Sequence, residues 1–178
     1  MDVLEIIGRN YEAGTPLYNC LVEHSKQVAE MAVEIAERHP ELNLDKKFLY
    51  EAAMLHDIGI FYTDAPSIYC TGSEPYIRHG VLGAELLRKE GLEAHARVAE
   101  RHTGTGLTEE EIIERDLPLP HQNFEPETME EQVICFADKF FSKTKLGQRR
   151  SPEKVEESLS KFGSVPVEKF RRWAEMFL

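Results

Sequence analysis

The stretch MLHDIGI, residues 54–60, ends an apolar segment with an adjacent histidine and aspartate. Apolar residues recur at helical spacing from about residue 45 to 56, which predicts a helix over that range, before the glycine at position 59. Ionisable side chains are costly to bury unless something pairs with them. A local salt bridge would satisfy His56 and Asp57. A metal ion would satisfy them as well, but it requires further ligands elsewhere in the chain.

Helix signals recur on both sides of this stretch. Thr15-Pro16 is an N-cap followed by proline, and it opens a long helix that ends at about residue 38. Thr108 and Thr128 each precede a glutamate by three residues, which is the pattern of a capping box. Further helices are predicted over 76–90 and 92–102, and from near Ser151 and Pro166 onwards. We find no convincing strand alternation, so the sequence predicts an all-α fold. Two long loops are expected at 57–77 and 115–127.

Length and charge limit the possible functions. The chain has 178 residues, 42% of them hydrophobic, which suggests a single domain over 1–178 with a substantial core. The formal net charge of −11 argues against stable binding of nucleic acid or of an anionic membrane. It leaves an anionic small molecule possible as a substrate, because a bound cation can reverse the field locally.

The cysteines and the first residues indicate the compartment. Cys20, Cys70 and Cys135 lie far apart and form no CxxC pair, so neither a disulfide framework nor a zinc knuckle is expected. The first ten residues carry acids and no long apolar run, so we expect neither a signal peptide nor a membrane anchor. A reducing cytoplasm is the expected location.

Six imidazole or carboxylate side chains fall on apolar helix faces. His24, for example, is followed by Val28, Met31 and Ile35 at helical spacing. The full set is His24, His56, Asp57, His79, His102 and Asp138. Singly, each would more often be a hydrogen-bonded core residue or a member of an ion pair. Together, and with few inward lysines or arginines expected to satisfy them, they favour a shared cation.

The order of these residues resembles the HD-domain superfamily of metal-dependent phosphohydrolases, over roughly residues 16–145. The signature of that family is a histidine, an adjacent His-Asp and a late aspartate, which match His24, His56-Asp57 and Asp138. His79 and His102 match the two further histidines of the members that bind two metals. The resemblance implies an HD-domain helical bundle, with a metal-binding core at about 16–145 and further helices over 152–178.

The resemblance also implies a ligand scheme. His24, His56 and Asp138 would bind one ion, His79 and His102 the other, and Asp57 would bridge both as the central catalytic residue. Such a donor set suits divalent Fe, Mn, Co, Ni or Zn, with Mg also possible. Water between two cations about 3.5–4 Å apart loses its proton near neutral pH and can attack phosphorus. The implied substrate is a nucleotide or another small phosphate ester.

Basic residues are concentrated after Asp138, where KFFSKTKLGQRR, residues 139–150, contains no acid. This stretch is interpreted either as a rim that receives a phosphate or as a cationic helix end that favours the dipole. Lys139 and Lys143 are the nearest candidates for a phosphate contact. Arg78 and Arg101, each directly before a proposed histidine ligand, are further candidates.

Two alternatives to the hydrolase stay open, and one departure from the family pattern bears on the second of them. Many members have a phosphate-contacting lysine directly after HDIG, where this chain has Ile60. The same six ligands also serve mixed-valence diiron oxygenases of the HD fold, which is the first alternative. A non-catalytic ligand-binding HD domain is the second. The basic stretch favours the hydrolase over the oxygenase, and the intact ligand set argues against the binding domain. His95 is a candidate to replace or support His102.

Overall fold

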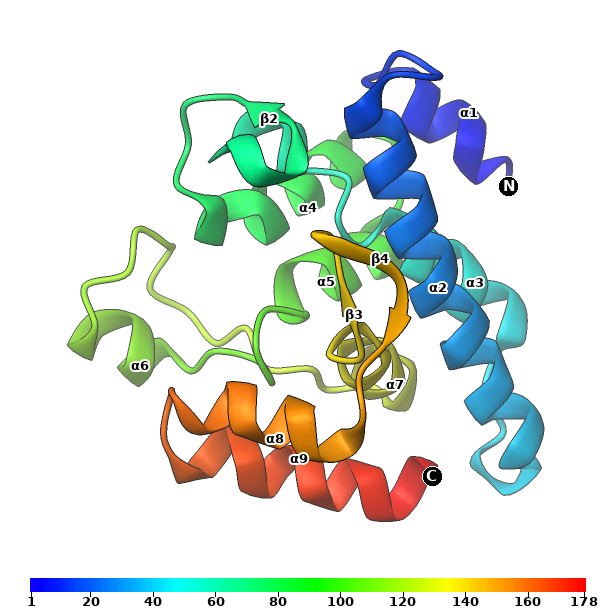
Figure 1. The fold of residues 1–178 in the computed structure, drawn as a ribbon, viewed down its shortest axis with the longest axis vertical. Helices are drawn as coiled ribbons and strands as arrows, with labels where there is room; N and C mark the ends of the chain where they lie inside the picture. The colour runs from blue at the N-terminus through cyan, green and yellow to red at the C-terminus, as the bar shows by residue number, and fades with distance from the viewer.

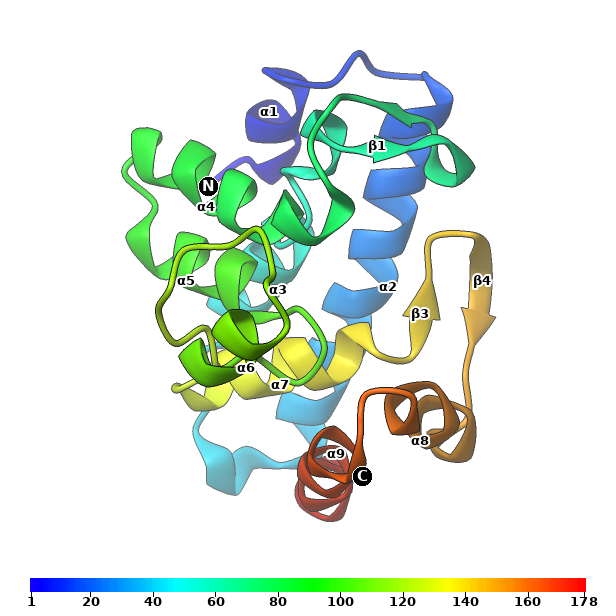
Figure 2. The same cartoon turned by 90° about the vertical axis from the view of Figure 1, so that its left-hand side faces the viewer.

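The computed structural model describes all of residues 1–178 and consists mainly of helices, as predicted (Figure 1). The helices are α1 (Val3–Gly8), α2 (Pro16–Arg38), α3 (Lys46–Leu55), α4 (His79–Lys89), α5 (Glu93–Arg101), α6 (Glu109–Glu114), α7 (Met129–Asp138), α8 (Pro152–Ser160) and α9 (Ser164–Phe177). In both views α1 lies at one end of the molecule and α9 at the other (Figures 1 and 2). None of the helices combines the length and the apolar character that crossing a bilayer requires.

The predicted caps form. Thr15 accepts a hydrogen bond from the Tyr18 amide at the start of α2. Thr108 and Thr128 each complete a capping box with the glutamate three residues on. The predicted helix over 76–90 differs in its first turn, which is a 3-10 turn over Tyr76–Arg78, so that α4 proper begins at His79. Helix α1, capped by Asp2, was not predicted.

Two small antiparallel sheets correct the expectation that the chain has no strands. Strand β1 (Asp64–Ala65) pairs with β2 (Cys70–Thr71), and β3 (Phe141–Ser142) pairs with β4 (Lys145–Arg149). Strands of two residues are too short to show alternation. Strand β4 is exposed at four of its five positions, so it has no buried face that a hydrophobic pattern could reveal.

The core joins the C-terminal helices to the rest of the chain. One cluster of buried apolar side chains includes residues from Val3 to Phe177. Helix α9 packs against α7, where the Phe136 ring lies 5.0 Å from the Phe170 ring and 5.4 Å from the Phe177 ring, between centroids. The indole N–H of Trp173 donates to the side chain of Gln132 on α7 at 3.0 Å. The aromatic residues of α9 therefore close one side of the core.

Candidate metal centre

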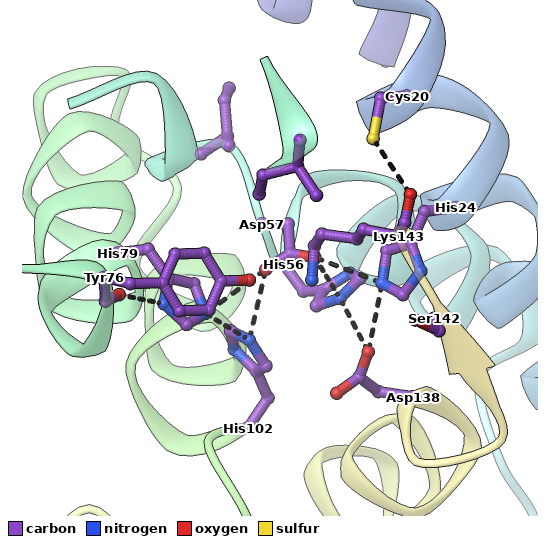
Figure 3. Close-up of polar contacts among 12 residues, drawn as sticks. Cys20, His24, His56, Asp57, Tyr76, His79, His102, Asp138, Ser142 and Lys143 are labelled. Atoms are coloured by element: carbon purple, nitrogen blue, oxygen red, sulfur yellow. Dashed lines mark hydrogen bonds and ion pairs between the residues drawn. The ribbon is translucent and has the colours of Figure 1, made fainter. Parts of the chain in front are cut away.

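The six predicted ligands come together in one buried cluster (Figure 3). His24 lies in the middle of α2, and His79 is the first residue of α4. The other four lie at helix C-termini, with His56 and Asp57 following α3, His102 following α5, and Asp138 ending α7. The most exposed of the six, Asp138, has a relative exposure of 9%.

Asp57 lies at the centre of the cluster and faces two groups of ligands. Its Oδ2 lies 3.1 Å from Nε2 of His24 and 3.1 Å from Nε2 of His56. Its Oδ1 lies 3.3 Å from Nε2 of both His79 and His102. Asp138 joins the first group, with its Oδ1 3.1 Å from His24 Nε2. The cluster thus contains two groups that can hold a metal ion, and they share Asp57.

Backbone carbonyls orient three of the histidines. Nδ1 of His56 lies 2.6 Å from the Ala53 carbonyl oxygen, and Nδ1 of His102 lies 2.7 Å from that of Ala99. Nδ1 of His79 lies 2.6 Å from the Tyr76 carbonyl oxygen. Because a carbonyl oxygen can only accept, each Nδ1 carries a proton, so that in the neutral form of the ring Nε2 presents its lone pair to the cluster.

This arrangement fits cations. Nε2 of His79 and Nε2 of His102 are 3.0 Å apart, and neither can donate to the other while both protons are on Nδ1. Nε2 of His56 and Oδ1 of Asp57 are buried and have no hydrogen-bond partner. Lone pairs that converge without donors cost free energy, and shared cations relieve that cost.

Two lysines also reach the cluster, although few inward cations were expected. Nζ of Lys143 lies 2.6 Å from Asp57 Oδ2. Nζ of Lys139 donates to Asp138 Oδ2 at 2.8 Å and to the His102 carbonyl at 3.0 Å. These ammonium groups offset the charge of the two carboxylates but supply no donor to the facing histidine lone pairs. The lysines therefore do not replace a metal.

The pKa values show that the carboxylates attract positive charge. Burial by itself lowers the pKa of His56, but Asp57 and Asp138 outweigh it and raise that pKa to about 9. Burial would raise the pKa of Asp57, but His56 and Lys143 hold it well below its usual range. Burial lowers the pKa of His102 to about 4, so this ring stays neutral and able to bind a cation.

Gly59 brings the HDIG turn against α4. A Cβ at this position would lie 2.2 Å from the His79 carbonyl oxygen and 2.4 Å from the Gly83 amide nitrogen. Only a residue without a side chain allows this approach, and Gly83 makes the same contact from the other side, with a Cβ there 3.0 Å from the Gly59 nitrogen. The packing of two glycines thus places Asp57 beside His79.

Gly59→Ala should therefore destabilise the protein and loosen the centre. Overpacking of this kind costs about 1–3 kcal/mol, which lowers Tm by roughly 2–4 °C per kcal/mol for a chain of this size. Gly8→Ala is the matched control, because a Cβ at Gly8 meets nothing within 4 Å. Thermal unfolding monitored by circular dichroism measures both variants. Equal Tm values for the two would contradict the role assigned to Gly59.

Two cavities adjoin the cluster. One, of about 320 Å³, is mostly apolar and includes Tyr76, Leu107 and Phe162 in its walls. The other, of about 420 Å³, contains Asp138, Lys139 and Lys143. Tyr76 and Phe162 contribute to both, and the Tyr76 ring stacks on His79 with 4.5 Å between centroids. The cluster is therefore accessible from both cavities, and we call the first the apolar cavity and the second the basic cavity.

Of the four residues that we suggested for a phosphate contact, two line a cavity beside the cluster and two do not. Lys139 and Lys143 line the second cavity. Arg78 instead pairs with Glu74 at 2.8 Å, and Arg101 binds the Glu125 carbonyl and Glu127. Neither arginine lines either cavity, because successive helix residues point about 100° apart and a neighbour of an inward histidine faces elsewhere.

Other residues also differ from the sequence analysis. His95 packs against Phe48, with 4.9 Å between ring centroids, and lies near Glu51 rather than in the cluster. Tyr76 and Phe162 line the cavities but were not singled out as site residues. Tyr76 could have been found from its position three residues before His79. Phe162 lies in the turn between α8 and α9, and no feature of the sequence pointed to it.

The matches to known proteins agree with this geometry. The sequence profile of the HD domain matches residues 21–142, so the chain belongs to the HD-domain family. The HD domain of the phosphodiesterase PgpH from L. monocytogenes has a similar fold, with a TM-score of 0.55 and 14% identity over 96% of this chain and 94% of that one. The same domain in complex with cyclic-di-AMP gives a TM-score of 0.56, with 15% identity over 97% of this chain and 94% of that one.

Two relatives by sequence match over 70% or more of this chain. A tRNA (cytidine(56)-2'-O)-methyltransferase of Thermoplasma volcanium is 35% identical over 133 residues, which are 74% of this chain and 34% of the relative. An uncharacterized protein of Methanocaldococcus jannaschii is 38% identical over 128 residues, 70% of this chain and 68% of the relative. The chain therefore spans about a third of the methyltransferase.

Proposed function

We propose that this protein is a metal-dependent phosphohydrolase that acts on a nucleotide or a related small phosphate ester at a two-metal centre. The observation that carries the proposal is the position of Asp57. Each of its oxygens faces a separate group of imidazoles, at 3.1 Å on one side and 3.3 Å on the other. His24, His56 and Asp138 would hold one ion, His79 and His102 would hold the second, and Asp57 would bridge them.

Divalent transition metals bound here would supply Lewis acidity toward a phosphate oxygen and toward water. Imidazole and carboxylate donors suit Fe, Mn, Co, Ni or Zn. The chain's own contribution is to hold the donors in place. Three rings are fixed by carbonyls of the same helical turn, and both carboxylates stay ionised beside cationic neighbours.

Lys143 is the residue best placed to bind the substrate phosphate. Its ammonium group lies beside Asp57 and lines the basic cavity. With metal ions held by Asp57, that ammonium would lose its carboxylate partner and could pair with a phosphate oxygen instead. Many family members have a phosphate-contacting lysine directly after HDIG, where this chain has Ile60. Lys143, on the β3–β4 hairpin, would supply that positive charge instead.

The lining of the two cavities beside the centre supports a nucleotide as the substrate. The apolar cavity offers Tyr76 and Phe162 to a base, and the basic cavity offers Lys143 and Ser142 to a phosphate. The cyclic-di-AMP complex of the PgpH domain, which shares the fold, also supports a nucleotide.

Lys143→Met should weaken substrate binding and leave the metals in place. Loss of a charge-assisted hydrogen bond costs about 1.5–3 kcal/mol, so kcat/KM should fall roughly 10- to 150-fold. Lys26→Met, an exposed lysine on α2, is the control. Steady-state kinetics and metal analysis measure both. An unchanged kcat/KM for Lys143→Met would remove this lysine from the binding site.

A screen of the metal-loaded protein against nucleotides and simple phosphate esters tests the function. The proposal predicts phosphate or nucleotide release from one substrate class. Dioxygen consumption by the iron-loaded protein without phosphate release would instead indicate an oxygenase. Ligand binding without turnover of any substrate would indicate a binding domain.

A further inference from the structure

The basic cavity continues away from the metal centre. A third cavity, of about 480 Å³, shares Ser142, Thr144, Arg150 and Ser158 with it and has no hydrophobic side chain in its lining. Its walls come from the β3–β4 hairpin and from α8, which follows β4 directly (Figure 2). We call this third cavity the β4–α8 groove.

The β4–α8 groove concentrates positive charge in an acidic protein. It is lined by five cations, Lys145, Arg149, Arg150, Lys154 and Lys161, and by a single carboxylate, Glu157. Only Arg149 forms an ion pair, with Glu34 at 3.6 Å. The whole chain has a net charge of −11, so the other four cations, which are unpaired, form a local field opposite in sign to that of the molecule. Such a field attracts an anion that carries several charges.

The groove also offers suitable donors. Ser142, Thr144 and Ser158 place hydroxyl groups among the cations. Guanidinium, ammonium and hydroxyl groups are the donors that bind phosphate oxygens. Arg150 lines both the groove and the basic cavity next to Lys143. A phosphate at the metal centre would therefore have its neighbouring phosphate near Arg150 and the following ones along α8.

We propose that the β4–α8 groove binds further phosphate groups of the substrate, so that the substrate is a nucleotide extended by a chain of phosphates rather than a mononucleotide. This rests on the proposed function, since it assumes that one phosphate lies at the metal centre. The chain is either the phosphodiester backbone of a short oligonucleotide or a polyphosphate. The apolar cavity on the other side of the centre takes the terminal base.

Lys154 and Lys161 test the proposal, because Lys154 lies on α8, Lys161 follows it directly, and neither contacts a metal ligand. The double variant Lys154→Glu, Lys161→Glu reverses charge at the far part of the groove. Lys47→Glu, Lys89→Glu is the matched control, since it makes the same change in net charge at two exposed lysines elsewhere. Both variants are compared with wild type in their metal-loaded form.

Binding is measured with phosphorothioate analogues, which resist hydrolysis, of uridine 5′-monophosphate, 5′-phosphorylated tetrauridylate and UTP. Wild type should bind one of the two longer ligands about tenfold or more tightly than the monophosphate, with a steeper dependence on salt. The groove variant should lose most of that gain and keep its affinity for the monophosphate, while the control variant behaves as wild type. Tighter binding of the tetrauridylate would identify the phosphate chain as a phosphodiester backbone, and tighter binding of UTP would identify it as a polyphosphate.

Equal affinity for all three ligands in wild type would overturn the proposal, as would an equal loss in the groove and control variants. Turnover of the unmodified ligands is measured in parallel. A length-dependent gain in binding without any hydrolysis would overturn the proposed function and leave the groove assignment standing.

Discussion

Asp57→Asn should remove the metal ions and abolish hydrolysis. Asparagine has the same shape, but its amide nitrogen is a donor and would face one group of histidines in place of an oxygen. Neither ion would keep a bridging carboxylate, and the several kcal/mol of charge stabilisation that metals provide would vanish. The expected loss in kcat/KM is about a thousandfold or more.

Metal analysis and steady-state kinetics measure the effect of Asp57→Asn, and circular dichroism verifies that the variant is folded. Asp138→Asn is the informative comparison, because Asp138 faces only the His24 and His56 group. It should affect one ion, whereas Asp57→Asn should affect both. A folded Asp57→Asn variant that kept its metals and its activity would refute the bridging role.

The double variant His79→Ala, His102→Ala should lose one metal ion and keep the other. These two histidines contact Asp57 Oδ1 and belong to the second group alone. The metal content should fall from two ions per chain to about one, and activity should fall by about a hundredfold or more because a single ion no longer stabilises both the attacking and the leaving oxygen.

His95→Ala is the matched control, because it removes an imidazole from α5 that packs against Phe48 outside the cluster. It should leave two ions bound. If the double variant still held two ions, or if His95→Ala also lost one, the second metal site would be wrongly assigned.

The six clustered residues could be predicted because each lies on an inward helix face or directly after a helix whose apolar side is buried. His24 shares a face with apolar residues one, two and three turns further on, and the burial of its side chain follows from that spacing. The helix caps could be predicted for a similar reason, since Thr108 and Thr128 bond within four residues of themselves. Helical periodicity and capping patterns were therefore sufficient where the contacts lie within one helix or at its end.

The surroundings of the centre depend on contacts between distant segments. The β3–β4 hairpin carries Lys143 back to Asp57, 86 positions earlier in the numbering, and no periodic pattern marks that return. Phe162 and Lys161 reach the cavities only because α8 follows the hairpin and packs against α9. Arg78 and Arg101 show the opposite case, where adjacency in sequence to a histidine suggested a contact that the helix geometry does not make.

Anomalous-scattering crystallography of protein purified without chelators tests the central claim most directly. The account predicts two transition-metal peaks per chain, one on each side of Asp57, each in contact with one of its carboxylate oxygens. The first peak should touch His24, His56 and Asp138, and the second should touch His79 and His102. A single peak that does not touch Asp57, or a cluster without any peak in protein that is active, would contradict the two-metal centre.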